Sequence, residues 1–386
     1  MERLAVRERP DWRRQADAVG FAYLADDGTP YWDETACYRF SLAQIEDHIE
    51  APTQALLSMC YQAVDHILAH EPLLRRLGIP ESAWDYVRAT WRRQDKDLYG
   101  RFDLQYDGAG SAKLYEFNAD TPTALFEAAV FQWQWLEQAI EAGIVGAGAD
   151  QFNSIHERVI EAFGNFDLGE RRLHLACVRD HTEDRWTVEY LEDCARQAGL
   201  ATQFVHVEDI GITADGRFTD LEDRVITDLF KLYPWEWLLA ETFGPRLLAD
   251  TMHVIEPAWK LTLSNKGLLA VLWEMFTGHA NLLPAYFADD PRAAALGERV
   301  VRKPLLGREG VDIGIGRAPP RHPGPYGDEG FVVQALCELP SFGGKRPVIG
   351  SWVVAGQACG IGIREDDHAI TGNAARFVPH VILDSA

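Results

Sequence analysis

The stretch that most constrains the fold is residues 101–118, with the sequence RFDLQYDGAGSAKLYEFN. Two runs of alternating polar and apolar residues flank a glycine-rich turn, and this pattern predicts a β-hairpin. Pairing Tyr106 with Lys113 sets the antiparallel register. Side chains two apart share a face of a strand, so one face is wholly apolar and comprises Phe102, Leu104, Tyr115 and Phe117. A slip of one residue would mix the two faces, so the pattern itself supports this register.

The other face of the hairpin is polar, with Asp103 opposite Glu116 and Arg101 opposite Asn118. Two carboxylates and an amide oxygen that converge on one face suit a hard cation such as Mg²⁺. Arg101 is always cationic and cannot be a ligand, but it suits a phosphoryl or carboxylate oxygen. A solvated hairpin face with ordinary Asp–Arg pairing would explain these residues equally well, so the rest of the chain has to decide.

Length, charge and cysteine usage limit the class of protein. A chain of 386 residues suggests two or three lobes. It contains no apolar run near the ~20 residues of a membrane span, its start lacks an apolar export core, and its six cysteines show no metal spacing. We therefore expect a cytoplasmic protein with reduced thiols. The net charge of −22 argues against nucleic acid and is compatible with a cationic substrate such as a polyamine, although acidity also serves solubility.

The first part of the chain reads as helical around the hairpin. Apolar spacing predicts helices over 41–68 and 81–97. A third helix is expected to open at Thr121 and Pro122 and to run to about residue 142. Its start would lie beside the polar hairpin face, where free N–H groups favour an anionic ligand. Helix capping alone would explain Thr121 equally well.

Residues 150–255 read as an α/β lobe. Strands are expected at 173–178, 202–207 and 225–229, with a helix at 187–198 between the first two, and this order predicts parallel pairing. Glu183 and Asp184 fall in the loop after the first strand. Ligands bind at the carboxyl ends of such strands, so the acidic pair is a candidate amine site, with an exposed turn as the alternative. No GxGxxG follows that strand, which excludes a dinucleotide-binding dehydrogenase.

From residue 256 the residues of interest are Lys266, Lys303 and a glycine-rich basic loop. Lys266 falls in the first turn of an expected helix, where a counter-anion would remove its conflict with the helix dipole. Lys303 lies on an expected strand that leads into the loop 307–310, which can close over a triphosphate. A β-hairpin tip would look similar. Further strands are expected at 331–336 and 377–383, with a hairpin of the same sheet at 347–354 and 360–364.

Five motifs together resemble one known family. In chain order they are RFDLQYDGAGSAKLYEFNADTPTALFEA, EPAWKLTLSNKGLL, VRKPLLGREG, GPYGDEGFVVQALCELP and VIGSWVVAGQACGIGIRED. The chain resembles the synthetase domain of glutathionylspermidine synthase and its stand-alone acid–amine ligase relatives, from about residue 20 onward. The resemblance implies an α/β (α+β) ATP-grasp fold in the glutathione-synthetase-like arrangement. It divides the chain into a helical region with the metal hairpin (1–149), an inserted α/β substrate lobe (150–255) and a nucleotide-binding lobe with a lid loop (256–386).

The resemblance also implies which residues hold ATP and Mg²⁺. The implied metal ligands are Asp103, Glu116 and Asn118. The implied catalytic residue, an arginine that stabilises the transferring phosphoryl group, is Arg101. The implied ATP-binding residues are the two lysines, the lid loop and a position on the adenine-edge strand: Lys266, Lys303, Gly307, Arg308, Gly310 and Gln334.

For the substrates, the resemblance implies contacts from Thr121 and Arg364 to a peptide-like acid and an acidic pair, Glu183 and Asp184, in the substrate cleft. Leu232 stands where glutathione-using members carry a hydroxyl residue, which argues against glutathione itself. Nothing in the chain corresponds to the amidase domain of the bifunctional members, so amidase activity is not expected.

The expected activity is ATP- and Mg²⁺-dependent ligation of a peptide or amino-acid carboxylate to a polyamine or other amine through an acyl phosphate. No GxSxG or Cys–His signature suggests a covalent enzyme nucleophile. Two alternatives stay open: the same chemistry on an unrelated acid and amine, and a nucleotide-binding regulator without catalysis.

Overall fold

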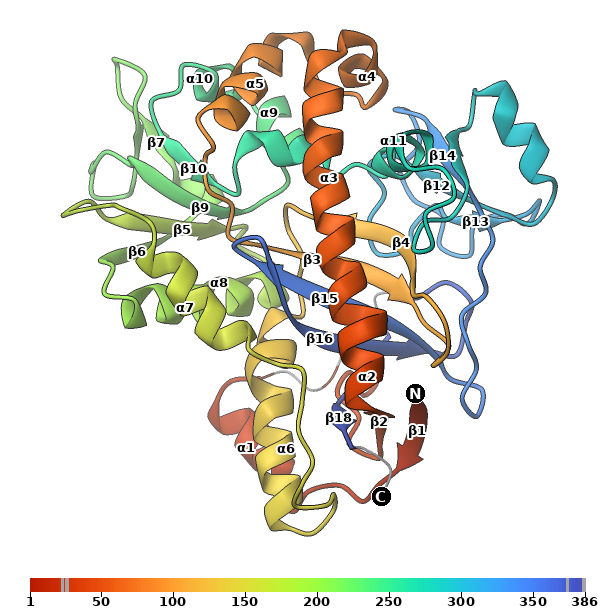
Figure 1. The fold of residues 1–386 in the computed structure, drawn as a ribbon. Helices are drawn as coiled ribbons and strands as arrows, with labels where there is room; N and C mark the ends of the chain where they lie inside the picture. Colours follow the sequence, from red (N-terminus) through yellow and green to blue (C-terminus); the bar gives the residue numbers. More distant parts are fainter. Residues whose placement is uncertain (22–23, 25–27, 373–374, 384–386) are drawn as a thin grey trace.

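A five-stranded antiparallel sheet forms the centre of the computed structural model, which describes residues 1–21, 24, 28–372 and 375–383 (Figure 1). Its strand order is β17–β16–β15–β3–β4, with bounds Arg376–Val378, Gln357–Asp366, Arg346–Val354, Tyr99–Gln105 and Lys113–Asn118. The long helix α3 (Ala51–Ala69) crosses in front of this sheet in the view shown, and contacts β16. The sheet therefore joins the early hairpin to strands that lie more than 200 residues later.

The polar register predicted for the hairpin is confirmed. Asp103 pairs with Glu116 and Arg101 pairs with Asn118. On the opposite face, the rings of Phe102 and Phe117 stack with centroids 3.9 Å apart. Burial of these apolar side chains fixes which face of the hairpin points to the core, because a one-residue slip would expose them.

The predicted pairing at the turn end of the hairpin is wrong. Lys113 pairs with Gln105, where we expected Tyr106, because a β-bulge follows Asp103. The bulge leaves Tyr115 as the extra residue of its strand. Tyr115 consequently lines the cavity described below and does not join the apolar face.

A four-stranded parallel sheet lies beside the central one. Its order is β10–β9–β5–β6, with bounds His253–Ile255, Asp228–Leu232, Leu173–Cys177 and Thr202–His206. The predicted parallel pairing of the first two strands is confirmed. The predicted third strand lay three residues too early, so Leu232 is part of β9. Helix α8 (Thr182–Gln197) begins five residues before the predicted start, which places Glu183 and Asp184 in its first turn and not in a loop.

A second antiparallel sheet carries the predicted lysine strand. Its order is β11–β14–β12–β13, with bounds Ala285–Phe287, Phe331–Ala335, Val300–Pro304 and Gly314–Ile315. We expected β15 and β16 in this sheet, but they pair with β3 and β17 in the central one. The predicted last strand is two strands separated by Pro379, since β18 (His380–Ile382) leaves for a third sheet of order β1–β2–β18, with β1 at Glu2–Ala5 and β2 at Ala36–Phe40. The short pair β7 (Gly211–Ile212) and β8 (Phe218–Thr219) completes the strands.

The helices follow the sequence pattern at Ser41 and depart from it at Thr121. Ser41 and Gln44 form a reciprocal capping box at the start of α2 (Leu42–Ile45), which leads through a π-turn into α3, as predicted. Thr121 is no helix cap, because 121–124 is not helical and Ala124 has φ 65°. A residue before proline avoids helical angles, which favours this delay. The helix begins after Ala124 and passes through a π-turn at Glu127–Phe131 into α6 (Gln132–Glu141).

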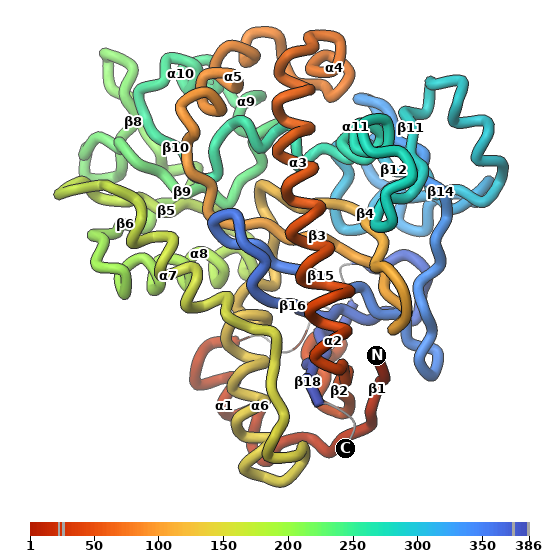
Figure 2. Tube along the Cα trace, viewed as in Figure 1, coloured from red at the N-terminus to blue at the C-terminus, as the bar shows by residue number. Residues whose placement is uncertain are grey.

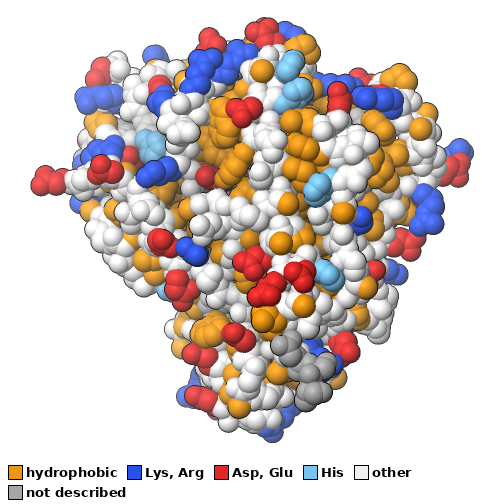
Figure 3. Space-filling view, in the orientation of Figure 1, with side chains coloured by type: hydrophobic (Ala, Val, Ile, Leu, Met, Phe, Trp, Pro, Cys, Tyr) orange, Lys and Arg blue, Asp and Glu red, His pale blue; other side chains and the backbone are white. Residues whose placement is uncertain are grey.

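The remaining helices lie around the sheets and at the two ends of the molecule, as the tube in Figure 2 shows. They are α1 (Trp12–Ala18), α4 (Glu71–Arg76), α5 (Trp84–Arg92), α7 (Ile155–Gly164), α9 (Trp235–Ala240), α10 (Gly244–Leu247) and α11 (Leu268–Met275). No helix in the described part of the chain has the length and apolar character needed to cross a bilayer. Acidic and basic side chains are interspersed over the face drawn in Figure 3. The division at 149 and 255 stays a prediction.

Candidate active site

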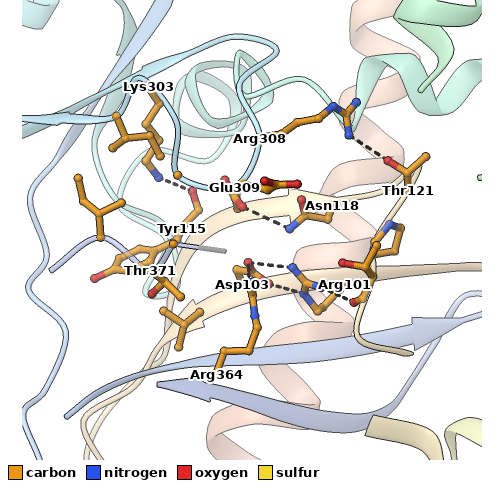
Figure 4. Close-up of a pocket in the computed structure, with 18 of the residues that line it drawn as sticks. Arg101, Asp103, Tyr115, Asn118, Thr121, Lys303, Arg308, Glu309, Arg364 and Thr371 are labelled. Atoms are coloured by element: carbon orange, nitrogen blue, oxygen red, sulfur yellow. Dashed lines mark hydrogen bonds and ion pairs between the residues drawn. The ribbon is translucent and has the colours of Figure 1, made fainter. Parts of the chain in front are cut away.

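A cavity of about 300 Å³ lies where the polar hairpin face, the lysine-bearing sheet and the carboxyl edge of the parallel sheet meet (Figure 4). The predicted site residues in its lining are Arg101, Asp103, Glu116, Asn118, Thr121, Glu183, Asp184, Lys303, Arg308, Gly310, Gln334 and Arg364. The other two, Lys266 and Gly307, line a smaller adjoining cavity that shares Glu116 and Asn118 with the first. Residues that are far apart in sequence are thus brought to one place.

Asp103 is the centre of a buried charge cluster. Its Oδ1 accepts a hydrogen bond from Arg101 Nε at 2.6 Å, and its Oδ2 accepts one from Arg364 Nη2 at 2.6 Å. Arg101 comes from the same strand as Asp103, whereas Arg364 reaches it from β16. Two guanidinium groups therefore converge on one carboxylate, as charge-assisted hydrogen bonds of this kind favour.

Glu116 lies on the neighbouring strand and is held by other cations. Lys266 Nζ is 3.1 Å from its Oε2, and Asn118 Nδ2 donates to its Oε1 at 3.3 Å. Burial alone would raise the pKa of Glu116, but Lys266 and Lys303 outweigh burial and hold it at about 2. Glu116 is therefore an anionic oxygen donor at neutral pH.

The donor set fits Mg²⁺. Asp103, Glu116 and Asn118 offer two carboxylates and an amide oxygen from two paired strands. Mg²⁺ takes few protein ligands and keeps waters or phosphate oxygens in its shell. The described residues hold no group of three or more His, Cys, Asp and Glu placed for a metal. The proposed donor set differs from such a group because its third member, Asn118, offers an amide oxygen.

The two lysines approach Glu116 from different elements, Lys303 from the larger cavity and Lys266 from the smaller one. Lys303 Nζ donates to Tyr115 O at 2.8 Å and to Gln334 Oε1 at 2.8 Å. Burial lowers the pKa of Lys303 to about 8, although Glu116 partly opposes this. Lys266 was expected in the first turn of a helix, but it precedes α11 and donates to Gly307 O at 2.5 Å. Lys303 therefore shares the larger cavity with all three oxygen donors, and Lys266 shares the adjoining one with Glu116 and Asn118.

The loop 307–310 lies over the cavity, and its arginine reaches the opposite wall (Figure 4). Arg308 Nη1 donates to Thr121 Oγ1 at 2.9 Å, and Arg308 Nη2 lies 2.5 Å from Glu236 Oε1. Gly310 has φ 74°, and a Cβ there would stand 2.8 Å from Thr371 O. A side chain at Gly310 would force the loop away from residue 371, so the glycine permits the close approach.

The wall at the carboxyl edge of the parallel sheet is acidic. Burial raises the pKa of Glu183. His181, which directly precedes α8, has a pKa raised to about 9 by its side-chain hydrogen bond with Asp184, which favours the imidazolium near neutral pH. A buried carboxyl beside an ion pair can hold or accept a proton in this part of the cavity.

Two carboxylates near the cavity were not among the predicted site residues. Glu127 accepts a hydrogen bond from the Tyr31 hydroxyl at 2.8 Å, and burial together with the charge of Glu183 raises its pKa to about 7. Its only signal in the sequence is a single charge inside the apolar run TALFEAAV. Glu236 follows β9 and binds the lid arginine; nothing in its neighbours marks that contact.

The sequence model of the family described as glutathionylspermidine synthase preATP-grasp matches residues 3–383. A Haemophilus influenzae protein provisionally named acid–amine ligase is 44% identical over 395 residues, which cover 97% of this chain and 98% of that one. The bifunctional glutathionylspermidine synthetase/amidase of Escherichia coli is 25% identical over 402 residues, which cover 96% of this chain and 63% of that protein. Trypanothione synthetase of Crithidia fasciculata is 26% identical over 344 residues, covering 82% of this chain and 52% of that one.

A solved structure has the same fold. It is a glutathione synthetase-like effector of Globodera pallida, with a TM-score of 0.62 over 97% of this chain and 96% of that one, at 11% sequence identity. At this identity the likeness speaks for the fold alone, and it agrees with the predicted glutathione-synthetase-like α/β architecture. The chain belongs to the glutathionylspermidine synthase preATP-grasp family, and it is a C–N bond-forming ligase of the ATP-grasp class.

Proposed function

We propose that the protein is an ATP- and Mg²⁺-dependent carboxylate–amine ligase that forms an amide bond through an acyl phosphate. One observation carries the proposal: the oxygen donors Asp103, Glu116 and Asn118 face Lys303 across the same cavity that Glu183 lines. A ligation of two substrates needs a nucleotide-and-metal site and an amine site within one cavity, because the reacting atoms have to meet there.

In the first step, a carboxylate oxygen of the acid attacks the γ-phosphorus of ATP. An O–P bond forms, the bond to the β,γ-bridging oxygen breaks, and ADP leaves. Arg101 neutralises the transferring phosphoryl group, and Arg364 beside it orients the carboxylate of the acid. Mg²⁺, held by Asp103, Glu116 and Asn118, supplies charge neutralisation on the phosphate oxygens when bound.

In the second step, the amine nitrogen attacks the carbonyl carbon of the acyl phosphate. The C–N bond forms, the C–O bond breaks, and inorganic phosphate leaves. The amine gives up a proton, which Glu183 accepts, because burial raises the pKa of this carboxyl and so makes it a stronger base than an exposed one. The loop 307–310 keeps water from the reactive anhydride.

The side chains around the acceptor end indicate small-molecule partners of a particular kind. The acidic pair favours an amine that carries positive charge, such as a polyamine. Leu232 is buried and lines the cavity, so it offers an apolar contact where a hydroxyl would otherwise bond the acid. We therefore propose a peptide or amino-acid carboxylate other than glutathione as the acid, and no nucleic-acid partner.

ADP release with Mg²⁺ and ATP, screened over pairs of acids and amines, tests the proposal. The expected result is release that requires both an acid and an amine, with mass spectrometry showing the amide in equal amount. Leaving out either substrate is the control. Tight ATP binding without turnover on any pair would instead favour a nucleotide-binding regulator.

Nucleotide affinity should fall as pH rises through the pKa of Lys303. That pKa is about 8 in the ligand-free protein, so the ammonium that meets the triphosphate is charged below this pH and lost above it. We expect the Kd of a non-hydrolysable ATP analogue to rise about tenfold from about pH 7.5 to about pH 9.5, by isothermal titration calorimetry. In Lys303→Arg the charge persists, so its Kd should stay flat. An equal rise in both proteins would remove Lys303 from the site.

A further inference from the structure

The lid residue Arg308 occupies a small site on the wall opposite its own loop. Its guanidinium is bound by the carboxylate of Glu236 and the hydroxyl of Thr121, at 2.5 Å and 2.9 Å. The ring of Trp237 lies alongside, with its centroid 5.5 Å from Arg308 Cζ. A carboxylate, a hydroxyl and an aromatic face are the groups that recognise a cation in a partly dry site.

Arg308 does not use all the hydrogen-bonding capacity of this site. Glu236 Oε2 and Arg308 Nε are both shielded from solvent and have no hydrogen-bond partner among the described residues. Each such group costs free energy, so the guanidinium is an imperfect occupant. A compact ammonium with three N–H donors could bond to both carboxylate oxygens and to Thr121 Oγ1.

Glu236 lies next to the acceptor end of the cavity: it is not in the lining itself, but Thr121, Trp237 and Arg308, which it adjoins, are. Strands β5 and β9 are neighbours, and their last residues, Cys177 and Leu232, pair directly. Glu183 follows the first of these strands and Glu236 follows the second. The two carboxylates therefore stand at the carboxyl ends of adjacent parallel strands, which is where ligands bind in such sheets.

We propose that Glu236, Thr121 and Trp237 form a second cation subsite of the acceptor cleft, which Arg308 and a charged nitrogen of the amine substrate occupy in turn. The inference rests on the proposed ligase function. It makes the preferred amine one with two cationic nitrogens: Glu183 and Asp184 receive one, and Glu236 receives the other.

Alternate occupancy would couple the lid to the amine. While Arg308 is bound to Glu236, its guanidinium is turned away from the nucleotide phosphates. An amine nitrogen that takes its place frees Arg308 for the phosphates. Charge neutralisation of ATP would then be complete only with the amine in place, which limits hydrolysis of ATP without an acceptor.

Binding of 1,4-diaminobutane and butylamine, measured by calorimetry without ATP, tests the subsite, because these amines differ only in the second nitrogen. Removing the competitor in Arg308→Ala should tighten the diamine by about tenfold and leave butylamine unchanged, as one charge-assisted hydrogen-bond site becomes vacant. Adding Glu236→Gln to this variant should abolish the gain. Glu241→Gln in the same background is the matched control, since Glu241 ends the same helix and binds Tyr233.

Equal diamine affinity in the native protein and in Arg308→Ala would overturn the proposal. It would also be overturned if Glu236→Gln and Glu241→Gln, each added to Arg308→Ala, lowered the diamine affinity equally. Hydrogen exchange of 305–312 in the native protein gives an independent readout that does not depend on any variant. The diamine should speed exchange there and butylamine should not; no difference between them also overturns the proposal. Neither measurement involves turnover, so a failed ligation screen with a positive result here would sink the ligase function and leave cation binding standing.

Discussion

Asp103→Asn is expected to lower the rate of amine-dependent ADP release by about a thousandfold, because it removes one proposed metal carboxylate and the shared anion of two arginines. The substitution keeps the shape of the side chain. It leaves Arg101 and Arg364 without the carboxylate that now holds them at 2.6 Å each. The loss therefore combines weaker metal binding with poorer orientation of the guanidinium groups, and both effects act on the transferring phosphoryl group.

Initial rates of ADP release over a Mg²⁺ titration measure this effect. The rate should recover only partly at high Mg²⁺, since added metal does not restore the positions of the arginines. Asp107→Asn is the matched control: Asp107 lies in the exposed turn of the same hairpin, where its carboxylate accepts from Ala109 N. A rate in Asp103→Asn within about threefold of Asp107→Asn would be incompatible with a phosphoryl-transfer site on this hairpin.

Lys231→Met is expected to lower the free energy of unfolding by about 3–5 kcal/mol, because it strands a buried carboxylate. Lys231 Nζ lies 2.5 Å from Asp120 Oδ1, and both side chains are 1% exposed. Asp120 also accepts from Trp235 N at 2.9 Å, so it joins the end of the hairpin to the segment after β9. Without the ammonium, Asp120 must stay charged in an apolar setting or take up a proton, and both are costly.

Chemical denaturation followed by circular dichroism checks the size of this loss. Arg317→Met is the comparison, because Arg317 pairs with Glu298 on the surface, where the side chains are 87% and 74% exposed, and exposed pairs contribute little. The double variant Lys231→Met with Asp120→Asn should recover part of the stability by removing the stranded charge. A loss in Lys231→Met no larger than in Arg317→Met would show that the buried pair does not hold the two segments together.

The sequence alone sufficed for the parts of the site that rest on local alternation. Asp103, Glu116 and their partners could be placed on one face because a period of two puts alternate side chains on the same face of each strand, although the register at the turn end was wrong. Tyr115 could not, since the bulge that turns it depends on distant partners: its hydroxyl donates to Cys337 O, and its carbonyl accepts from Lys303. Bulges of this kind are settled by tertiary contacts and leave no mark in a two-residue pattern.

The predicted helix boundaries near the site were wrong for a related reason. His181 stands where Ser, Thr, Asp or Asn is the usual N-cap residue, and its contact there is an ion pair with Asp184. The usual N-cap residues therefore did not indicate the start of α8, and the prediction placed it five residues too late. Thr121 carried those signals but serves to bind Arg308, a contact with a loop nearly 190 residues away. In the sequence, a polar residue that lines a cleft can look the same as a helix N-cap. Only the folded structure distinguishes the two roles.

The pairing of β3 with β15 has a consequence for synthesis on the ribosome. Residues 99–105 are translated early, but their sheet partner at 346–354 emerges only after most of the chain has been translated. Contacts of such long separation form late, whereas the segment between them, with its neighbouring parallel strands, can collapse first as a unit. The nascent polypeptide thus carries an uncovered aromatic hairpin for much of its elongation, which makes this stretch a natural client for chaperones.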